Sequence, residues 1–343
     1  MKNLSKISWQ VGELEYRAEP SLSYSLIAKY AREGFSCLEN LDEKISTPSL
    51  EFGSAVDTIL TGTEEEFKQK FYITNVPKPT GKIADIINNL FLLYQNDYPS
   101  VNNMPDELIL SKCDEFDYYK NKKDDSRIAL IKEKGTSYYY QLQDSKNKII
   151  LDSGTYEEVM QAVNSIKLNN TTNKYFSKDI VEFDGIEKFY QLKFRSTIDN
   201  IPYKVMLDII VVDHRNKEIY LCDLKTTSKP EYLFYESFVK WNYDIQSRIY
   251  TKVVKDNISK DNYFKDFTIQ PFRFIVVNRY NPNPLVWQFD NNDDLTLEYN
   301  LIKLKNPFEL GKELHYYISN NSKLPKEINV NKTNSIEKWL MKM

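Results

Sequence analysis

The chain has 343 residues, 41% of them hydrophobic and 14% aromatic, with a formal net charge of -3. This composition supports a substantial buried core, in one large domain or in a domain with an inserted lobe, and excludes a chain that is disordered throughout. The slightly acidic balance argues against a uniformly basic nucleic-acid-binding protein but is compatible with a local basic groove.

Helical patterns fill the first hundred residues. Residues 20–24 open a helix with hydroxyl caps, and this helix ends near Gly34. A second helix, over residues 50–60, carries Asp57 at the edge of its apolar stripe. Residues 83–94 make a third helix.

The pattern after Pro105 is mixed. Residues 138–151 form either a short hairpin or a helix–loop element. A capping box formed by Thr155 and Glu158 then begins another helix, because a threonine followed three residues later by a glutamate satisfies the first free backbone N–H groups.

From residue 186 the pattern becomes strand-like. Apolar and β-branched runs over 186–221, with a turn at Asp199–Asn200, predict a three-stranded meander. The later predicted elements are a long helix over 231–254, strands over 271–278 and 285–289, and a closing helix over 308–318.

The last two strands of the meander bring three charged residues together. If their turn is centred between Arg215 and Asn216, antiparallel pairing sets Asp208 directly opposite Asp223, with Cβ atoms about 4.5–5.5 Å apart. Because side chains alternate along a strand, Asp223 and Lys225 point to the same face. Two carboxylates and one ammonium therefore converge.

An aspartate in the middle of a strand needs compensation. Asp208 lies between apolar neighbours, where a carboxylate disfavours the strand and is costly to bury unpaired. A Mg²⁺ shared with Asp223 would compensate it, since hard divalent cations prefer one or two carboxylates plus water and phosphate. The plainer alternative is a carboxylate that closes a turn or pairs with a lysine. The shared face favours a metal-dependent phosphodiesterase site.

Three further side chains are candidates for this site, each with a plainer alternative. Gln246 and Tyr250 lie four residues apart on one helix face, where they would hydrogen-bond a scissile phosphate or Lys225. Otherwise they are a solvated glutamine and a half-buried tyrosine. Asp57 would complete the metal shell, or else it is an ordinary surface aspartate.

The remaining charged or ligating groups of note are two lysine clusters, over 78–82 and 120–123, and two histidines. The lysines would contact phosphates or, as is more frequent for charge runs, face water. His214 and His315 lack the spacing and the neighbours of metal ligands, so we expect both to be structural or exposed.

The three cysteines, Cys37, Cys113 and Cys222, are far apart and form no CxxC pair. This argues against a disulfide framework, a structural zinc site and an iron–sulfur cluster, and it fits a reducing cytoplasm. The N-terminal stretch is charged, and no apolar run approaches the ~20 residues of a membrane span. We therefore expect a soluble, cytoplasmic protein.

The combination of Asp208, Asp223-x-Lys225 and Gln246-x-x-x-Tyr250 resembles the RecB-like branch of the PD-(D/E)XK nucleases. Three blocks are similar to successive blocks of the RecE-type phage exonucleases: Pro20-Ser-Leu-Ser-Tyr-Ser-Leu, Phe52-Gly-Ser-Ala-Val-Asp57-Thr-Ile-Leu and Asp223-Leu-Lys-Thr-Thr. The resemblance implies an α/β fold with a PD-(D/E)XK restriction-endonuclease-like core, in which a central mixed sheet is flanked by helices, together with a helical N-terminal part and an inserted lobe.

This chain departs from the family at one position. The block that begins at Phe52 usually presents a histidine to the metal, where this chain has Asp57. An acidic ligand occurs there in other branches, so Asp57 is a candidate replacement, and metal preference and activity depend on it. Glu187, on the strand before Asp208, is a further candidate, matched to an acidic position in relatives.

The resemblance implies a Mg²⁺- or Mn²⁺-dependent DNA nuclease, expected to be a double-strand exonuclease that resects ends in phage-type recombination. Its place would then be the cytoplasm of a bacterial host, if the gene belongs to a phage. Asp208, Asp223 and the Leu224 carbonyl would bind the metal. Lys225 would orient a metal-activated water for in-line attack that leaves a 5′-phosphate. DNA is the expected partner. A single-strand annealing protein or a recombinase, and a homo-oligomeric ring, are further candidates.

Two alternatives remain open: a nuclease fold that has lost catalysis and serves as a DNA- or protein-binding module, and an endonuclease that acts on structured or single-stranded DNA. The expected organisation is a single nuclease domain over 1–343. It consists of a helical N-terminal part over 1–100 that carries Asp57, an inserted lobe over 101–180, and a catalytic core with C-terminal strands and helix over 181–343.

Overall fold

The computed structural model describes residues 3–41, 46–146, 148–176, 185–290, 298–299 and 302–320. Contacts divide the chain into two units: residues 1–53, 60–62 and 162–343 form the first, and residues 54–59 and 63–161 form the second. The predicted partition, with boundaries at residues 100 and 180, stays a prediction.

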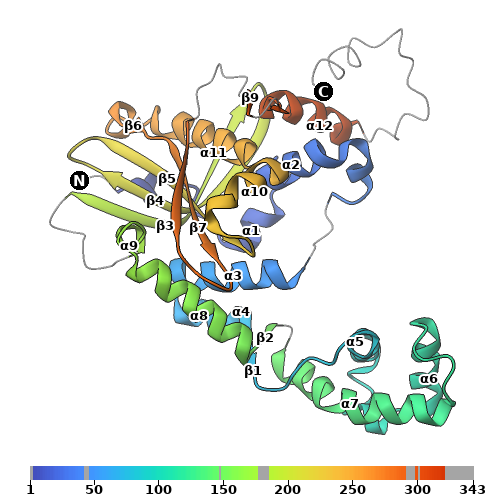
Figure 1. Cartoon of the computed structure of the whole chain (residues 1–343). Helices are drawn as coiled ribbons and strands as arrows, with labels where there is room; N and C mark the ends of the chain where they lie inside the picture. The colour runs from blue at the N-terminus through green and yellow to red at the C-terminus, as the bar shows by residue number, and fades with distance from the viewer. Residues whose placement is uncertain are drawn as a thin grey trace. The chain divides into compact units, whose positions relative to one another are not determined.

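The first unit is built on a mixed sheet with the strand order β3-β4-β5-β7-β8 (Figure 1). Its strands are β3 (Ile186–Ile198), β4 (Ile201–Asp213), β5 (Glu218–Thr227), β7 (Phe272–Asn278) and β8 (Leu285–Phe289), with the short β6 (Thr268–Ile269) paired to the start of β5. Strands β3, β4 and β5 run antiparallel, which confirms the predicted meander. Strand β7 runs parallel to β5, and β8 is antiparallel to β7.

Helices flank this sheet, so the expected α/β fold with a central mixed sheet is confirmed. The helices of the first unit are α1 (Glu13–Ala18), α2 (Tyr24–Glu33), α9 (Asn173–Phe176), α10 (Phe234–Trp241), α11 (Tyr243–Ile258) and α12 (Pro307–Ser319). Two helices, α3 (Pro48–Thr61) and α8 (Ser153–Leu168), contribute residues to both units. A further short pair, β9 (Glu298–Tyr299) and β10 (Ile302–Lys303), is antiparallel.

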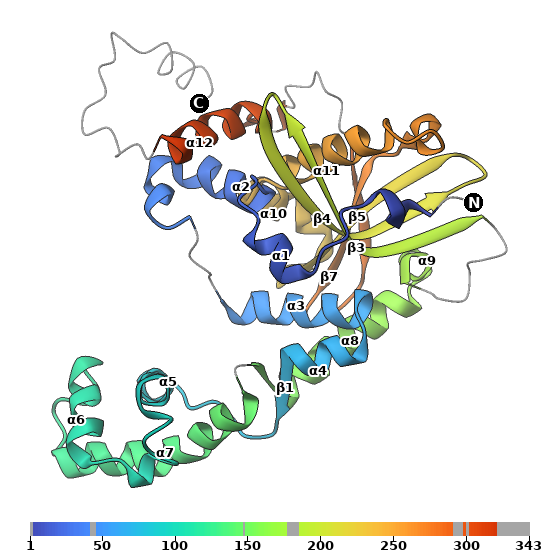
Figure 2. The ribbon, with the colours of Figure 1, turned by 180° about the vertical axis from the view of Figure 1, so that it is seen from behind.

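The core of the first unit lies between the sheet and α11. Helix α11 packs on β3 and β4 and against α2 and α12. Figures 1 and 2 show α2, α10 and α11 gathered on one side of the sheet. The buried residues Ile245 and Ile249 of α11 belong to the same apolar cluster as Phe272 and Phe274 of β7. This packing fixes the α11 residues that face the centre of the sheet.

The turn between β3 and β4 confirms a prediction. Asp199 and Asn200 have φ angles of 50° and 64°. Two left-handed residues in a two-residue loop match the right-handed twist of the flanking strands, and Asn and Asp tolerate this conformation better than most residues.

The predicted single helix over 231–254 is wrong. A 3₁₀ turn occupies Glu231–Leu233, and two helices, α10 and α11, follow it and meet at Asn242. Asn242 is left-handed, with φ 55° and ψ 49°, and its N–H caps the end of α10. The apolar pattern runs through the junction without a Gly or Pro, so the sequence carried no strong breaking signal.

The second unit is mainly helical. It contains α4 (Glu64–Lys70), α5 (Lys82–Tyr94), α6 (Asp106–Glu115) and α7 (Asp124–Ser145), together with the parallel strands β1 (Phe71–Thr74) and β2 (Ile149–Asp152). Its core includes the fully buried Ile86, Ile87 and Ile131. Residues 138–145 complete α7 and residues 149–151 belong to β2, so the hairpin interpretation of this stretch is wrong and the helix–loop interpretation describes only its first part.

The predicted cap of α8 is also wrong. Asp152 precedes the helix, and its carboxylate accepts hydrogen bonds from the backbone N–H and the hydroxyl of Thr155, both at 2.9 Å. Aspartate is as good an N-terminal capping residue as threonine, and here it lies closer to the start of the helix.

The three cysteines are all buried and free. Within the described ranges, we find no helix that combines the length and the apolarity needed to cross a membrane.

Candidate active site

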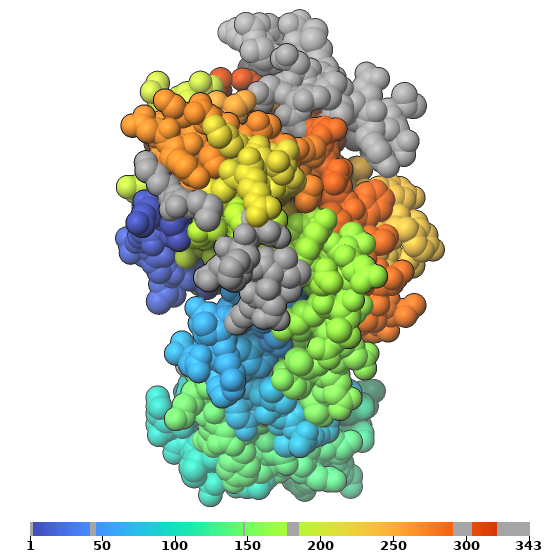
Figure 3. Space-filling model, turned by 90° about the vertical axis from the view of Figure 1, so that its left-hand side faces the viewer, coloured from blue at the N-terminus to red at the C-terminus, as the bar shows by residue number. Residues whose placement is uncertain are grey.

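The hairpin of β4 and β5 has the predicted register. Its pairs run from Asp213 opposite Glu218 to Ile209 opposite Cys222. The next step of this register sets Asp208 opposite Asp223. The turn is exposed at the surface, where it is yellow in Figure 3. The Asp213 carboxylate holds it by accepting from the backbone N–H groups of two turn residues, each at 3.0 Å.

Asp208 contacts the backbone of the neighbouring strand. Its Oδ2 accepts a hydrogen bond from the Leu224 N–H at 2.9 Å. The ladder between β4 and β5 stops at Cys222, so the carboxylate takes the place of a backbone acceptor for this N–H. Because a paired strand residue presents its N–H and C=O to the same neighbouring strand, the Leu224 carbonyl also faces the side of Asp208.

Asp223 is the centre of the site. It is 3% exposed, and its two oxygens have different partners. Oδ1 accepts from Gln246 Nε2 at 2.5 Å, and Oδ2 lies 2.6 Å from the Lys225 ammonium. The structure therefore brings together Asp223 and Lys225 of β5, as the alternation along the strand predicts, and adds Gln246 from α11 as a partner of Asp223.

Lys225 is held as a cation. Burial disfavours its charged form and so lowers its pKa. Four nearby groups together have a larger, opposite effect, so the pKa of Lys225 is raised: they are the Asp223 carboxylate, the hydroxyls of Tyr243 and Tyr24, and Asp208. Its Nζ lies 4.6 Å from the centre of the Tyr243 ring, a cation–π contact. A lysine with a raised pKa is a fixed positive charge and a hydrogen-bond donor, and it is poorly suited to accept a proton.

Tyr250 lies one turn beyond Gln246 on α11. It is buried, and its ring packs on Phe272 with centroids 6.2 Å apart. Burial raises its pKa well above the usual value, so the hydroxyl stays neutral. Tyr243, Gln246 and Tyr250 follow one another at helical spacing on the side of α11 that faces Asp223.

Tyr24 and Tyr243 are site residues that the sequence reasoning missed. Burial raises the pKa of both hydroxyls, and Lys225 opposes this rise in each. Tyr243 precedes Gln246 by one helical turn, and this spacing is a signal that could have found it. Tyr24 is about two hundred residues away along the chain, and the sequence has no local signal for its contact with this site.

Asp57 lies in the middle of α3, whose two ends contact the sheet of the first unit. An added Cβ at Gly53 would lie 2.9 Å from Thr226 Oγ1, so helix and strand approach closely there. At the other end, the Thr61 hydroxyl accepts from Gln191 Nε2 at 3.1 Å. Asp57 is half-buried, and its role as a metal ligand stays a prediction.

Glu187 and the two histidines lie elsewhere. Glu187 pairs with Val212 at the far end of the hairpin, and its Oε2 lies 2.9 Å from His214 Nε2. His214 also contacts the Tyr263 hydroxyl at 3.0 Å, so it is structural, as predicted. His315 lies on α12, 3.4 Å from the Ser319 hydroxyl.

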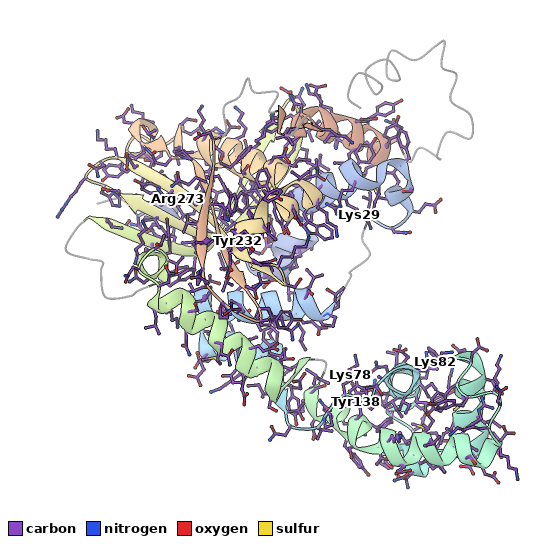
Figure 4. The ribbon with its side chains drawn as sticks, viewed as in Figure 1. Lys29, Lys78, Lys82, Tyr138, Tyr232 and Arg273 are labelled. Atoms are coloured by element: carbon purple, nitrogen blue, oxygen red, sulfur yellow. The ribbon has the colours of Figure 1, made fainter. Side chains whose placement is uncertain are left out.

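The two lysine clusters meet in the second unit, where Figure 4 labels Lys78 and Lys82. Lys82 Nζ donates to the Asp117 carbonyl at 3.1 Å, and the Asp117 carboxylate pairs with Lys120. Both clusters therefore adjoin one turn. Their contact with phosphates stays a prediction.

The donor set fits a hard divalent cation. Asp208 and Asp223 supply carboxylates, and the Asp223 Oδ2 is buried and has no hydrogen bond of good geometry, although it pairs with Lys225. A carboxylate oxygen has two lone pairs, so Asp223 Oδ2 has one left for a metal cation beside Lys225. Within the described ranges, no group of three or more His, Cys, Asp or Glu side chains is arranged to hold a metal. Two carboxylates completed by water and substrate phosphate suffice for Mg²⁺.

A family model described as "PDDEXK-like domain of unknown function (DUF3799)" matches residues 23–305, which include the whole hairpin and α11. No curated protein matches the chain. Among solved structures, the chain is similar to one from Eubacterium rectale described as "Putative exonuclease". The two are 13% identical over 94% of this chain and 97% of that chain, with a TM-score of 0.46.

Proposed function

The chain belongs to the family of PDDEXK-like domains, and from that premise we propose that it is a metal-dependent nuclease that hydrolyses phosphodiester bonds in DNA. The observation that carries the proposal is the gathering of charged groups at one point of β5: the Asp208 carboxylate accepts from the Leu224 N–H at 2.9 Å, and the Lys225 ammonium lies 2.6 Å from Asp223. Two carboxylates and a fixed cation on one face are the groups that phosphoryl chemistry needs.

Each group has a separate role. Asp208, Asp223 and the Leu224 carbonyl would hold Mg²⁺ or Mn²⁺, which supplies a nucleophilic water and offsets charge on the phosphate. Lys225 positions the attacking water and stabilises the negative charge that develops on the phosphate oxygens. Gln246 fixes the Asp223 carboxylate through its hydrogen bond. Asp57 is a further candidate ligand from α3.

The finer proposal is a double-strand exonuclease of the RecE-type branch that resects DNA ends in phage-type recombination. Its support is the resemblance of the blocks at Pro20, Phe52 and Asp223. On this account, a single-strand annealing protein or a recombinase takes the resected strand, and the subunits form a ring around DNA.

The experiment compares linear and circular duplex DNA in Mg²⁺, with 5′- and 3′-labelled ends on the linear form. An exonuclease degrades only the linear substrate, and the order of label release gives its polarity. Lys225→Ala should abolish degradation, whereas Lys217→Ala, in the exposed turn of the same hairpin, should leave it unchanged. Equal activity in the wild type and Lys225→Ala would end the assignment.

A second candidate is a DNA-binding module without catalysis. Asp57 in place of the usual histidine favours it, as does the finding that the described residues gather no third acidic or histidine ligand. This candidate predicts that the wild type binds duplex DNA and leaves it intact in both Mg²⁺ and Mn²⁺.

A further inference from the structure

An exposed tryptophan lies at the end of α10, close to the candidate active site. Trp241 is the last residue of this helix and is 41% exposed. The helix stops there because Asn242 is left-handed, so the Trp241 carbonyl has no helical partner. It accepts hydrogen bonds from the Tyr24 hydroxyl at 2.8 Å and from Arg32 Nη1 at 3.4 Å instead. Both contacts come from α2, which lies beside α10 in Figures 1 and 2.

Two cations flank the indole ring. The Arg32 guanidinium carbon lies 5.3 Å from the ring centre, and the Lys240 ammonium lies 4.8 Å from it. Over the described part of the chain, neither cation takes part in an ion pair, so both charges are available to an anionic partner. We name Trp241, Arg32 and Lys240 the Trp241 platform.

Two tyrosine rings connect this platform to Lys225. The Tyr24 ring lies 6.3 Å from that of Tyr243, which in turn lies 4.6 Å from Lys225 Nζ. Tyr24 also binds the Trp241 backbone directly. A strand whose phosphate reaches Lys225 would therefore have neighbouring nucleotides within reach of the indole.

We propose that the Trp241 platform stacks a base of an unpaired strand next to the scissile phosphate, with Arg32 and Lys240 on the flanking phosphates. Aromatic side chains beside cations are the means by which proteins hold single strands without sequence preference. Base stacking is stronger than an exposed cation–π contact, so a base displaces the flexible Lys240 from the ring. A paired base offers no free face, so the ligand is a single strand or a frayed end. This inference rests on the proposed function and specifies the state of the DNA at that site.

Binding of fluorescent oligothymidylate in the Lys225→Ala background tests the platform, because this background removes cleavage from the measurement. Trp241→Ala should weaken binding about ten-fold or more, and Trp241→Phe should restore most of the affinity because it keeps a ring. Tyr316→Ala, at an exposed aromatic on α12, is the matched control and should bind as its parent does. The contacts that hold Trp241 to α2 involve its backbone carbonyl, so the substitutions do not remove them.

An oligonucleotide of abasic sugar phosphates separates stacking from charge. The parent should bind it more weakly than oligothymidylate, and Trp241→Ala should cause no further loss. Arg32→Gln should reduce the slope of log affinity against log salt by about 0.7, the contribution of one contacted phosphate in a single strand. Unchanged oligothymidylate binding by Trp241→Ala, or an equal loss on the abasic ligand, would overturn the platform.

The same measurements distinguish the platform from the proposed function. If the wild type degrades DNA and Trp241→Ala binds as its parent does, only the platform is wrong. If the wild type leaves DNA intact but binding depends on Trp241, the platform stands and the nuclease assignment is wrong.

Discussion

The Lys225 ammonium lies 2.6 Å from the Asp223 carboxylate, and both side chains are mostly removed from water. Burying such a pair is costly, and replacing one partner leaves the charge of the other uncompensated. The pair lies beyond Cys222, where the pairing of β5 with β4 ends, and α11 covers it. We interpret this arrangement as a site whose charges serve chemistry, since well-packed apolar residues would stabilise the sheet as well or better.

Replacing the lysine tests its charge state. The raised pKa of Lys225 means that its stabilising contribution is fully present below about pH 10 and is lost only as pH rises through that raised value. Lys225→Met should therefore lower the free energy of unfolding by about 3 kcal/mol, equally at pH 6 and pH 9. Urea unfolding at the two pH values measures this. A loss that shrinks between pH 6 and pH 9 would mean that the lysine titrates within that range.

Gln246 is expected to act through Asp223, because its amide donates to the carboxylate that would hold the metal. Gln246→Ala should lower the rate of DNA cleavage about 10- to 100-fold, with part of the loss recovered at high Mn²⁺. The matched control is Gln270→Ala, whose side chain also donates to a carboxylate, that of Glu218, at the edge of the sheet. Equal rates for the two variants would contradict the positioning role.

The close approach of α3 to β5 is testable through Gly53. A Cβ there would lie 2.9 Å from Thr226 Oγ1, the residue after Lys225. Gly53→Ala should destabilise the chain by about 1 kcal/mol, and Gly53→Ala with Thr226→Ala should recover most of the loss. Urea unfolding of the four members of this cycle gives the coupling. Gly12→Ala is the control, because its Cβ meets nothing within 4 Å. Strictly additive effects would mean that the added Cβ at residue 53 does not clash with Thr226 Oγ1.

The sequence predicted the hairpin well because its signals are local. A polar turn between two β-branched runs sets the register, and the alternation along β5 then puts Asp223 and Lys225 on one face. Asp208 in an apolar strand was a visible anomaly. These features need only the period of a strand and the position of one turn.

The rest required long-range packing. The contact of Tyr24 with the end of α10 joins segments 217 residues apart. Helix α7 was hidden because its buried face includes Arg127 and Gln141, which obscure the apolar period. Glu187 is acidic and lies on the correct strand, but its pairing with His214 at the far end of the hairpin depends on register that its own segment does not determine.

Asp244 gives a pH-dependent prediction. It is 1% exposed, both its oxygens lack hydrogen-bond partners among the described residues, and burial raises its pKa from 3.8 to about 6, with Arg248 opposing the rise. Between these values the folded chain binds the proton more strongly than the unfolded chain, so stability falls as pH rises. Asp244→Asn removes this slope. From pH 4.5 to pH 7.5, the free energy of unfolding of the variant, measured in urea and taken relative to that of the wild type, should increase by about 2 kcal/mol. Parallel stability curves for the two proteins would contradict it.

Calorimetric titration of Mn²⁺ into the purified chain measures whether Asp208 and Asp223 hold a metal ion. We expect the wild type to bind Mn²⁺ and Asp208→Asn and Asp223→Asn each to abolish binding. Asp213→Asn, in the turn of the same hairpin, should leave binding unchanged. Wild-type affinity retained by the Asp208 and Asp223 variants would contradict the claim that these two carboxylates hold the catalytic metal.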